Sequence, residues 1–538
     1  MVIRPEMAIH HFSGRHPAIK DCREKCTSIL DWLQRNSDIK PQSDECALNM
    51  ERHASAGRRS LLAASTAGAF SVIVYAPLAA RRSAWSDDFP LLFDRSMTKV
   101  VADGRPVLAI VNSLIFGAAD NIAGLAALRL IGVAGIACLV AYLTWYLLRT
   151  GWPPLIATLT GCSIGLLPPF HAYAGWASVF SFPWVMLLGA VAGQLWVESR
   201  QEKHRSKAVL GFLGMTISLL AYPPAAMFCW VPLGIRLMSR PDPPRAAVSD
   251  AGRLGLLILT AGPVSLLIAR LSMVVVGVSP HSRFNFIDSL PEVADKLRWF
   301  VSRPPAIAVR PFMISSPSDA VGLLTAAPVL VLIVVGVTLR YEGSIGRRLF
   351  SLTVVGGVAV MTMFSHLVAA ENQTEFRYMA GLIVLTWVAL ILAGREIASR
   401  ALSGLMTPKV GEIICAAALV VVVVVATAAA HRNVDQVFIR PAEVKEEYLL
   451  KRLESFDPVQ HNRILIIDAE GDWPSRDNLG IYSVRTDLAH SWVIEPNVRL
   501  LLTQLHGDTV QPEIVIGKAA DSGPGDLILD LRPLVGRF

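Results

Sequence analysis

The sequence predicts an α-helical polytopic membrane protein with about 11 transmembrane helices and a small C-terminal extracytoplasmic α/β domain. Composition is the first reason, because 53% of the 538 residues are hydrophobic and only 17% are charged. Soluble proteins average roughly 45–50% apolar and about 25% charged residues. The second reason is that the apolar residues form blocks of about 20, the length that crosses a hydrocarbon core. These observations exclude a soluble enzyme, a DNA-binding module and a disordered chain.

Hydropathy places the spans between short charged loops. The predicted spans lie near residues 60–80, 125–148, 152–169, 181–197, 208–222, 224–239, 254–278, 321–339, 349–369, 379–394 and 413–430. Basic residues gather in alternate loops, which are therefore predicted to face the cytoplasm. These residues are Arg200, Lys203, Arg205, Lys207, Arg240, Arg245, Arg253, Arg340, Arg347, Arg348, Arg395, Arg400 and Lys409. Because the net charge of +7 comes mostly from these loops, it does not indicate a nucleic-acid partner.

Three regions follow from this topology. Residues 1–59 form a polar cytoplasmic tail without a cleavable signal peptide. Residues 60–430 form the transmembrane domain, and its outer loops are 81–124, 279–320 and 370–378. Residues 431–538 form a soluble domain on the outer face. In that domain helix-like runs alternate with strand-like runs, which predicts a small α/β fold. The strand-like runs are 464–468, 514–516 and 527–529.

The first outer loop carries two adjacent carboxylates, Asp87 and Asp88, at the mouth of the first span. Neighbouring, partly desolvated carboxylates repel each other, so one has a raised pKa unless a cation lies between them. This arrangement suits a general base for a hydroxyl group, or ligands of a divalent metal such as Mg²⁺ or Mn²⁺. The alternative is that the pair caps a helix or marks a solvated boundary. The loop continues through Asp103 and Arg105 into an amphipathic stretch, 107–119, that is expected in the membrane interface.

The loop 370–378 carries a second polar cluster, which includes Glu371 and Arg377. Its shortness holds it at the membrane surface, so Arg377 can face the headgroup of a lipid-linked substrate. The planar guanidinium group binds phosphate oxygens in pairs. The alternative is an interfacial arginine that snorkels to water beside Tyr378.

Three further features are candidates for binding. His171 lies in an aromatic, proline-broken segment that resembles a re-entrant loop lining a cavity, although an ordinary interfacial histidine is the commoner case. Arg270 lies in the seventh span, and an intramembrane arginine is functional by default unless the span ends near residue 269. The outer loop 279–320 carries basic and aromatic residues that suit anionic headgroups, or it forms a solvated face.

Together these motifs resemble a known family. Asp87-Asp88, Asp103-Gly104-Arg105-Pro106, the interfacial helix and a span opening Leu128-Arg129-Leu130 are similar to the polytopic GT-C glycosyltransferases. Within that class the similarity is greatest to the bacterial GtrII-like glucosyltransferase group. Glu371 with Phe376-Arg377-Tyr378 resembles the acidic-then-arginine loop late in those proteins. The resemblance extends over residues 60–430.

The resemblance implies transfer of a sugar from a polyprenyl-phosphate donor to a cell-envelope glycan or lipid acceptor, by direct displacement with inversion. The expected location is the outer face of the bacterial inner (plasma) membrane. Asp87 or Asp88 would accept the proton of the acceptor hydroxyl, or hold a metal ion. Arg377 would stabilise the phosphate leaving group, where negative charge develops. Asp103 and Arg105 would shape the site, and apolar grooves would hold the polyprenyl tail.

Two other classes of protein stay open. A polysaccharide polymerase or ligase uses the same lipid-linked donors and relies on a large outer loop rich in arginine and histidine. The loop 279–320 contains those residue types. A lipid-carrier transporter or flippase is expected to show paired ionisable residues near the bilayer midplane and an internal repeat, and neither is clear in this sequence.

Overall fold

The computed structural model describes most of the chain. The described residues are 42–93, 97–119, 121–201, 204–240, 244–281, 285–310, 319–341, 344–401, 407–467, 491–507 and 510–534. Residues 1–60 and 61–538 are two compact units, and every residue of the candidate site belongs to the second. Most of the predicted tail 1–59 lies outside the described residues, as does Asp468 of the first predicted strand.

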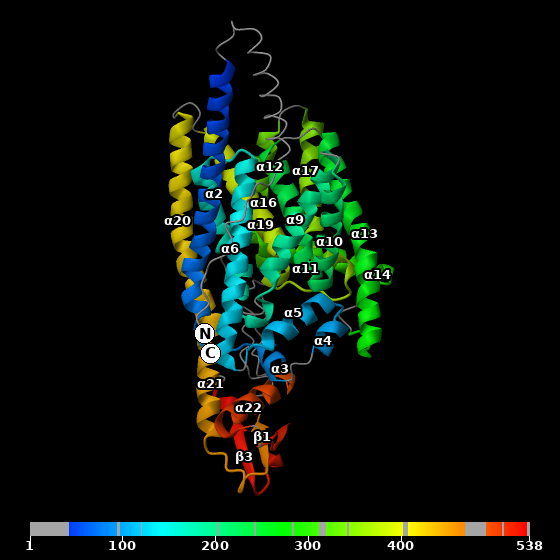
Figure 1. Ribbon diagram of the computed structural model, residues 1–538, viewed down its shortest axis with the longest axis vertical. Helices are drawn as coiled ribbons and strands as arrows, with labels where there is room; N and C mark the ends of the chain where they lie inside the picture. The colour runs from blue at the N-terminus through cyan, green and yellow to red at the C-terminus, as the bar shows by residue number, and fades with distance from the viewer. Residues whose placement is uncertain are drawn as a thin grey trace. The chain divides into compact units, whose positions relative to one another are not determined.

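Helices dominate the described chain (Figure 1). The α-helices are α2 Gln42–Ala79, α3 Asp88–Phe93, α4 Thr98–Ala102, α5 Pro106–Phe116, α6 Leu125–Arg149, α7 Pro154–Gly165, α8 Pro168–Gly175, α9 Phe182–Gln201, α10 Arg205–Ala221, α11 Pro223–Ala226, α12 Trp230–Ser239, α13 Pro244–Val276, α14 Leu290–Ser302, α15 Pro304–Ala308, α16 Asp319–Arg340, α17 Ile345–Met361, α18 Phe364–Val368, α19 Ala380–Ala401, α20 Pro408–Val434, α21 Arg440–Leu453 and α22 Ser491–His506. Short 3₁₀ segments include η2 Ala177–Val179 and η5 Phe376–Tyr378. Proline occupies the first positions of α5, α7, α8 and α14, where its missing N–H costs no hydrogen bond.

Six helices of the described chain are long and apolar enough to cross a membrane. They are Gly57–Ala79, Ile122–Arg149, Ala177–Ser199, Arg245–Val276, Ala380–Ala401 and Lys409–Leu453. A seventh candidate is the pair α7 and α8, which is bent by 56° at Pro168. The predicted 11 spans are therefore not confirmed. One physical reason is that α10 and α17 have only 17 residues each. At 1.5 Å per residue they reach about 26 Å, less than the roughly 30 Å of a hydrocarbon core.

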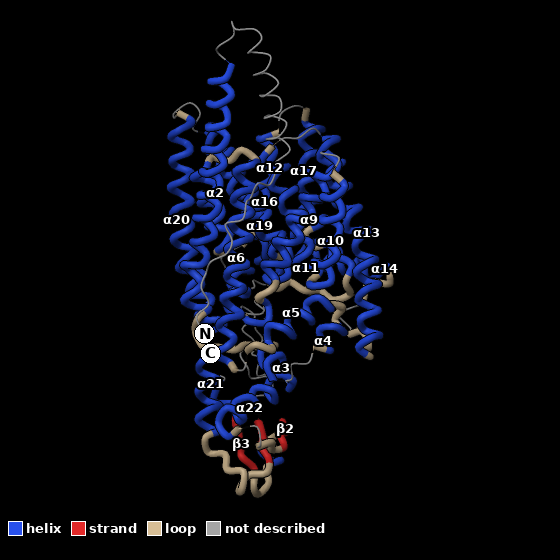
Figure 2. Tube along the Cα trace, in the orientation of Figure 1, coloured by secondary structure: helices blue, strands red, loops and turns tan. Residues whose placement is uncertain are grey.

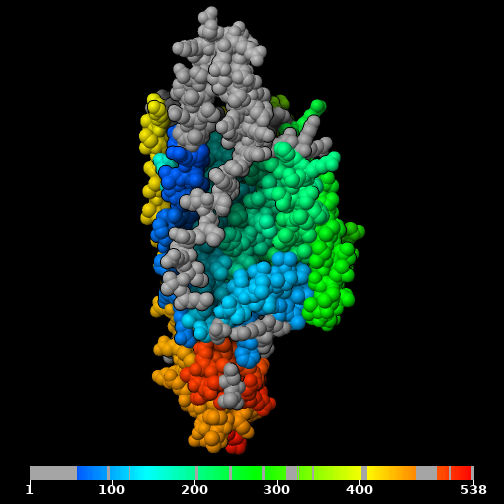
Figure 3. All heavy atoms as spheres, in the orientation of Figure 1, coloured from blue at the N-terminus to red at the C-terminus, as the bar shows by residue number. Residues whose placement is uncertain are grey.

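The three predicted outer loops contact one another. The backbone N–H of His281 donates to the carbonyl of Ala102 at 3.0 Å, which joins the first loop to the second. The N–H of Ala370 donates to the carbonyl of Asn285 at 3.0 Å, which joins the second loop to the third. Figure 3 shows α5, in light blue, beside the green surface of α13 at this end of the bundle. The apolar contact between them includes Met273 of α13.

The C-terminal domain contains the three predicted strands, and the structure pairs them in a small parallel sheet (Figure 2). Its strands are β1 Arg463–Ile467, β2 Glu513–Gly517 and β3 Asp526–Asp530, in the order β2-β1-β3. The apolar core of this domain is continuous with that of the first outer loop, because α22 packs on α3. Sequence composition places a domain boundary at residue 431, but the helix runs unbroken from Lys409 to Leu453. The domain is thus joined to the bundle by a continuous helix.

One buried arginine holds the first outer loop in place. Arg129 of α6 is fully buried, and its guanidinium group donates to three backbone carbonyls where α2 ends. Nε donates to Ala79 at 3.0 Å, Nη1 donates to Ser83 at 2.5 Å, and Nη2 donates to Arg81. Carbonyls at a helix C-terminus, such as that of Ala79, have no partner within the helix. An arginine that binds this carbonyl and those of Arg81 and Ser83 fixes the turn that follows.

The C-terminal domain binds the same turn from the other side. The side chain of Arg81 forms a two-pronged ion pair with Glu443 of α21, at 3.0 and 2.6 Å, and also pairs with Asp435. The next residue, Arg82, pairs with Glu446. These contacts fix residues 81 and 82 against the helix that leads into the C-terminal domain.

The contacts of Arg129 lead to a stability prediction. Arg129→Ala leaves two buried carbonyls and one partly buried carbonyl without their donors, and the loss at a buried carbonyl costs about 1–3 kcal/mol. We expect a clearly lower melting temperature for the purified protein in detergent. Arg270→Ala is the matched control, because Arg270 is exposed on α13 and its removal should change the melting temperature little. Equal melting temperatures for the two variants would contradict the role of Arg129.

Candidate functional site

A strained turn directly precedes the two adjacent carboxylates. Ser86 has a φ of +45°, a left-handed conformation that residues other than glycine rarely adopt. Such conformations cluster at functional sites. Helix α3 begins directly after the turn, and the N–H of Asp88 donates to the carbonyl of Trp85 at 2.9 Å. As a result Asp88 is buried, whereas Asp87 is only half-buried.

Asp88 joins two backbone segments. Its Oδ2 accepts the N–H of Trp85 at 2.9 Å, and its Oδ1 accepts the N–H of Ser178 at 2.7 Å. Burial raises the pKa of Asp88 to about 7, although both N–H donors and the charge of Arg129 act to lower it. Because each oxygen already accepts a backbone hydrogen bond, Asp88 is an internal anchor between the first outer loop and η2.

Asp87 lies on the accessible side of the turn. It is near Arg377, a cation that is remote from it in the sequence. Its negative charge is one of those that raise the pKa of Arg377. The two residues therefore lie within electrostatic range of each other, although one follows the first span and the other precedes α19. These are the two side chains that the sequence singles out for acid–base and phosphate chemistry.

Arg377 is held between aromatic rings. Its guanidinium carbon lies 4.6 Å from the ring centre of Trp176 and 4.7 Å from that of Tyr378. Nε donates to Glu375 at 2.6 Å, and the side chain is only 10% exposed. Burial acts to lower the pKa of Arg377. Glu375, neighbouring phenols and Asp87 outweigh it and raise the pKa above the usual arginine value. Arg377 is thus a permanently charged group with a fixed position.

A series of aromatic contacts links Arg377 to Arg105. The ring centre of Tyr378 lies 6.2 Å from that of Tyr222. The guanidinium carbon of Arg105 lies 4.8 Å from the ring centre of Tyr222. Gly104, with a φ of +78°, makes the turn that leads from Asp103 to Arg105. Asp103 pairs with Arg105 at 3.8 Å. The predicted substrate-binding residues Asp103 and Arg105 therefore belong to the same site as Arg377.

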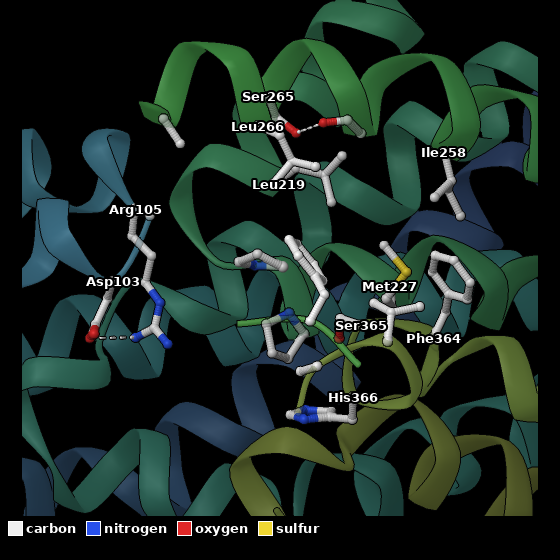
Figure 4. Close-up of a pocket in the computed structure, with 18 of the residues that line it drawn as sticks. Asp103, Arg105, Leu219, Met227, Ile258, Ser265, Leu266, Phe364, Ser365 and His366 are labelled. Atoms are coloured by element: carbon white, nitrogen blue, oxygen red, sulfur yellow. Dashed lines mark hydrogen bonds and ion pairs between the residues drawn. The ribbon is translucent and has the colours of Figure 1, made fainter. Parts of the chain in front are cut away.

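A cavity of about 310 Å³ opens beside these residues. In Figure 4 Arg105 and Asp103 lie along one side of it, and His366 lies along another. Apolar side chains from several helices line much of the remainder. They include Leu219 of α10, Met227, Ile258 and Leu266 of α13, and Phe364 of α18. The cavity is therefore amphipathic, with charged and polar groups in one part and an apolar wall in the other.

His366 is a cavity residue that the sequence analysis missed. Its side chain is buried, lines the cavity, and its Nε2 has no hydrogen-bond partner among the described residues. Burial, together with the positive charges of Lys296 and Arg105, lowers the pKa of His366 to about 3. The imidazole is therefore neutral, and its Nε2 can donate or accept a hydrogen bond with a ligand, depending on the tautomer. A lone histidine in an apolar stretch gives no sequence signal for such a role.

Glu371 also lines the cavity, as the sequence analysis expects of a binding residue. Its carboxylate accepts a hydrogen bond from Gln373 at 2.5 Å, and its backbone carbonyl accepts one from Lys296 at 2.7 Å. Lys296 is buried, and burial lowers its pKa. Lys296 and Trp299 thus support the third loop and do not form the exposed basic surface considered for residues 279–320.

Two predicted binding residues lie elsewhere. His171 is fully buried, and its Nε2 is 2.9 Å from the carbonyl of Leu166. It is not among the residues that line the cavity, so the expected contact with substrate has no support. Helix α13 continues to Val276, so the span does not end at 269 as the sequence allows. Arg270 is exposed on that helix and does not line the cavity.

The residues do not fit a metal shared by Asp87 and Asp88. Both oxygens of Asp88 accept backbone hydrogen bonds. In the described part of the chain, no group of three or more histidine, cysteine, aspartate or glutamate side chains is placed to hold a metal ion. The expectation that these two carboxylates form a Mg²⁺ or Mn²⁺ site is therefore not carried further.

Comparison of the chain with known protein families finds no matching family, and comparison with curated proteins finds no match either. The arguments for function consequently rest on the motifs and on the geometry of this site.

The different surroundings of Asp87 and Asp88 lead to a stability prediction. Asp88→Asn removes one of two buried acceptors and places an amide NH₂ against a backbone N–H, at a cost of about 1.5–3 kcal/mol. Asp87→Asn, at the half-buried neighbour, should leave the melting temperature close to that of the wild type. A reversed order of the two melting temperatures would contradict the assignment of Asp88 as the anchor.

The same carboxyl predicts a pH dependence. The pKa of Asp88 rises from an ordinary value near 4 in the unfolded chain to about 7 in the folded one. Between pH 4 and pH 7 the native state therefore binds more protons than the unfolded chain. The stabilisation that this proton binding gives to the folded state is complete below pH 4 and disappears as pH rises through 7. We expect the difference in unfolding free energy between wild type and Asp88→Asn to vary across pH 4–7. A constant difference would contradict the raised pKa.

Proposed function

We propose that this chain is an integral membrane glycosyltransferase of the GT-C type. It transfers a sugar from a polyprenyl-phosphate donor to a glycan or lipid acceptor of the cell envelope. The observation that carries the proposal is that Asp87 lies within electrostatic range of Arg377, whose neighbour Tyr378 lines an amphipathic cavity. A lipid-linked sugar phosphate needs such a combination, because it has an apolar tail, an anionic phosphate and a reacting sugar carbon.

The proposed chemistry is a single displacement with inversion. Asp87 takes the proton of the acceptor hydroxyl, and the hydroxyl oxygen forms a bond to the anomeric carbon. The bond from that carbon to the phosphate oxygen breaks at the same time, and the electron pair leaves with the polyprenyl phosphate. Arg377 stabilises the negative charge that grows on the phosphate. Its fixed position between two rings means that little reorganisation is needed during the reaction.

The cavity supports the choice of donor. Its apolar wall, to which α13 contributes most residues, suits the first isoprene units of the carrier. Arg105 lies at the polar end, where it can bind phosphate oxygens or a sugar hydroxyl. His366, neutral and without a protein partner for Nε2 in the described chain, suits a hydrogen bond to the sugar. Each chemical part of a polyprenyl-phosphate sugar thus has a matching surface.

The proposed location is the bacterial inner membrane, with the site and the C-terminal domain on its outer face. Basic residues of the opposite loops support this orientation. Those loops contact one another, since Arg240 donates to the carbonyl of Thr150 at 3.1 Å and Arg340 donates to that of Ser239 at 2.8 Å. A polymerase or ligase would use the same donors, and a transporter would carry them without reaction, so the experiment must separate these activities.

The test is mass spectrometry of surface glycans and polyprenyl-linked lipids from a deletion strain that carries wild type, Asp87→Asn or Asp88→Asn. We expect the deletion and Asp87→Asn to lose one sugar unit from the glycan and to accumulate the polyprenyl-phosphate sugar. Asp88→Asn should lower the amount of folded protein, with activity per molecule less affected than in Asp87→Asn. Glycan units that are complete but fail to lengthen would indicate a polymerase, and unchanged glycans would contradict a transferase.

The role of Arg377 has its own test. Arg377→Lys keeps the charge but loses the planar group that stacks on Trp176 and Tyr378. In vesicles supplied with purified donor and acceptor, we expect kcat to fall by about 10²-fold or more, as for loss of one charge-stabilising group. Arg270→Lys, the matched control on α13, should keep wild-type activity. Equal activity of the two variants would remove Arg377 from the mechanism.

A further inference from the structure

Helix α14, in the second outer loop, has three distinct faces. At 100° per residue, Leu290, Val293, Leu297 and Val301 lie along one stripe. All four are exposed, with exposed fractions of 85%, 41%, 58% and 67%. A second face, with Lys296 and Trp299, is buried against the protein. The third face carries the exposed charged residues Asp295 and Arg298.

This pattern differs from that of a spanning helix. Helix α14 has 13 residues and is not among the candidate spans, so crossing a bilayer does not explain its exposed apolar stripe. A helix at a protein–water boundary would expose charged residues over its whole outer surface. Here the outer surface is divided between an apolar part and a charged part, which is the pattern of a helix at the edge of a bilayer.

The contacts of α14 place it at the level where a membrane span ends. Lys296 donates to the carbonyl of Glu371 at 2.7 Å. The loop that contains Glu371 leads directly into α19, one of the six candidate spans. Helix α14 also packs on α15, and α15 packs on α16, whose outer side chains Leu324 and Val331 are exposed and apolar. The stripe on α14 is therefore close to an apolar surface that faces lipid if the chain spans a membrane.

We propose that the exposed apolar stripe of α14 binds the acyl chains of the outer leaflet. Arg298 then lies beside the phosphate headgroups, and Asp295 faces water. The same helix supports the loop that forms part of the cavity, because Lys296 donates to the backbone carbonyls of Ala370 and Glu371. The bridge between Phe286 and Ala369 lies directly before them. Contact with lipid at α14 thus holds two walls of the cavity at the membrane surface. This inference depends on the membrane placement of the chain and is independent of the transferase activity.

The test is lipid photocrosslinking of the full chain. Leu297→p-benzoylphenylalanine and Val301→p-benzoylphenylalanine place the probe on the stripe, and Asp295→p-benzoylphenylalanine is the control on the charged face of the same helix. Each protein is reconstituted in vesicles of phosphatidylethanolamine and phosphatidylglycerol that contain an alkyne-tagged acyl chain. All three positions are exposed, so the probe should fit without disturbing the fold.

After irradiation, we expect several-fold more tagged lipid on the two stripe variants than on the Asp295 variant. Two stripe positions one turn apart guard against the failure of either variant to fold, which size-exclusion chromatography would detect. Equal labelling at all three positions would overturn the proposal. Crosslinks from the stripe to a second copy of the chain, with no lipid adduct, would overturn it too, because the stripe would then be a protein interface.

Discussion

The candidate site depends on the three hydrogen bonds from Arg129 to the end of α2. A guanidinium group in so buried a place is costly to desolvate, and it is tolerated because carbonyl oxygens surround it and because Asp88 carries an opposing charge nearby. These bonds fix the direction in which the chain leaves the first span. The strained turn at Ser86 then sends one carboxylate inward and the other outward. Without Arg129, the position of Asp87 would depend on the ion pairs of Arg81 and Arg82 and on the hydrogen bonds of Asp88.

Arg377, the cation of the candidate site, is remote from Asp87 in the sequence. Aromatic residues fix its position relative to the first loop. Trp176 follows α8 and forms one face of the slot for Arg377, while the phenol of Tyr173 donates to the backbone carbonyl of Arg377 at 2.7 Å. The N–H of Ser178, two residues after Trp176, donates to Asp88. A short segment around η2 therefore fixes both the anchor of the first loop and the ring beneath Arg377. This shared segment explains how two residues remote in sequence keep a constant relationship.

The sequence predicted the helical class, the strands of the C-terminal domain and five members of the candidate site, because hydropathy and short polar motifs depend on local residues. These members lie in polar clusters between apolar blocks, where their chemistry stands out: Asp87, Asp103, Arg105, Glu371 and Arg377. The sequence could not show which of Asp87 and Asp88 is buried and which is accessible, since this depends on the backbone conformation at Ser86. It missed His366 because that side chain becomes a cavity residue only when α18 packs on α11 and α14. The 11 predicted spans are not confirmed, and one reason is that α10 ends before Pro223 and is too short to cross a hydrocarbon core.

The C-terminal domain is part of the same construction and is not a module on a flexible tether. The helix from Lys409 to Leu453 passes from α20 to α21 through a π-helical segment, Asp435–Ile439. In a regular α-helix, Asp435 and Glu443 would lie about 80° apart around the axis. One extra residue in a π-turn rotates the following part back by about 100°, which brings both carboxylates to nearly the same side. Arg81 binds both. The π-turn therefore allows one arginine of the first loop to couple the C-terminal domain to the carboxylate that we place in the reaction.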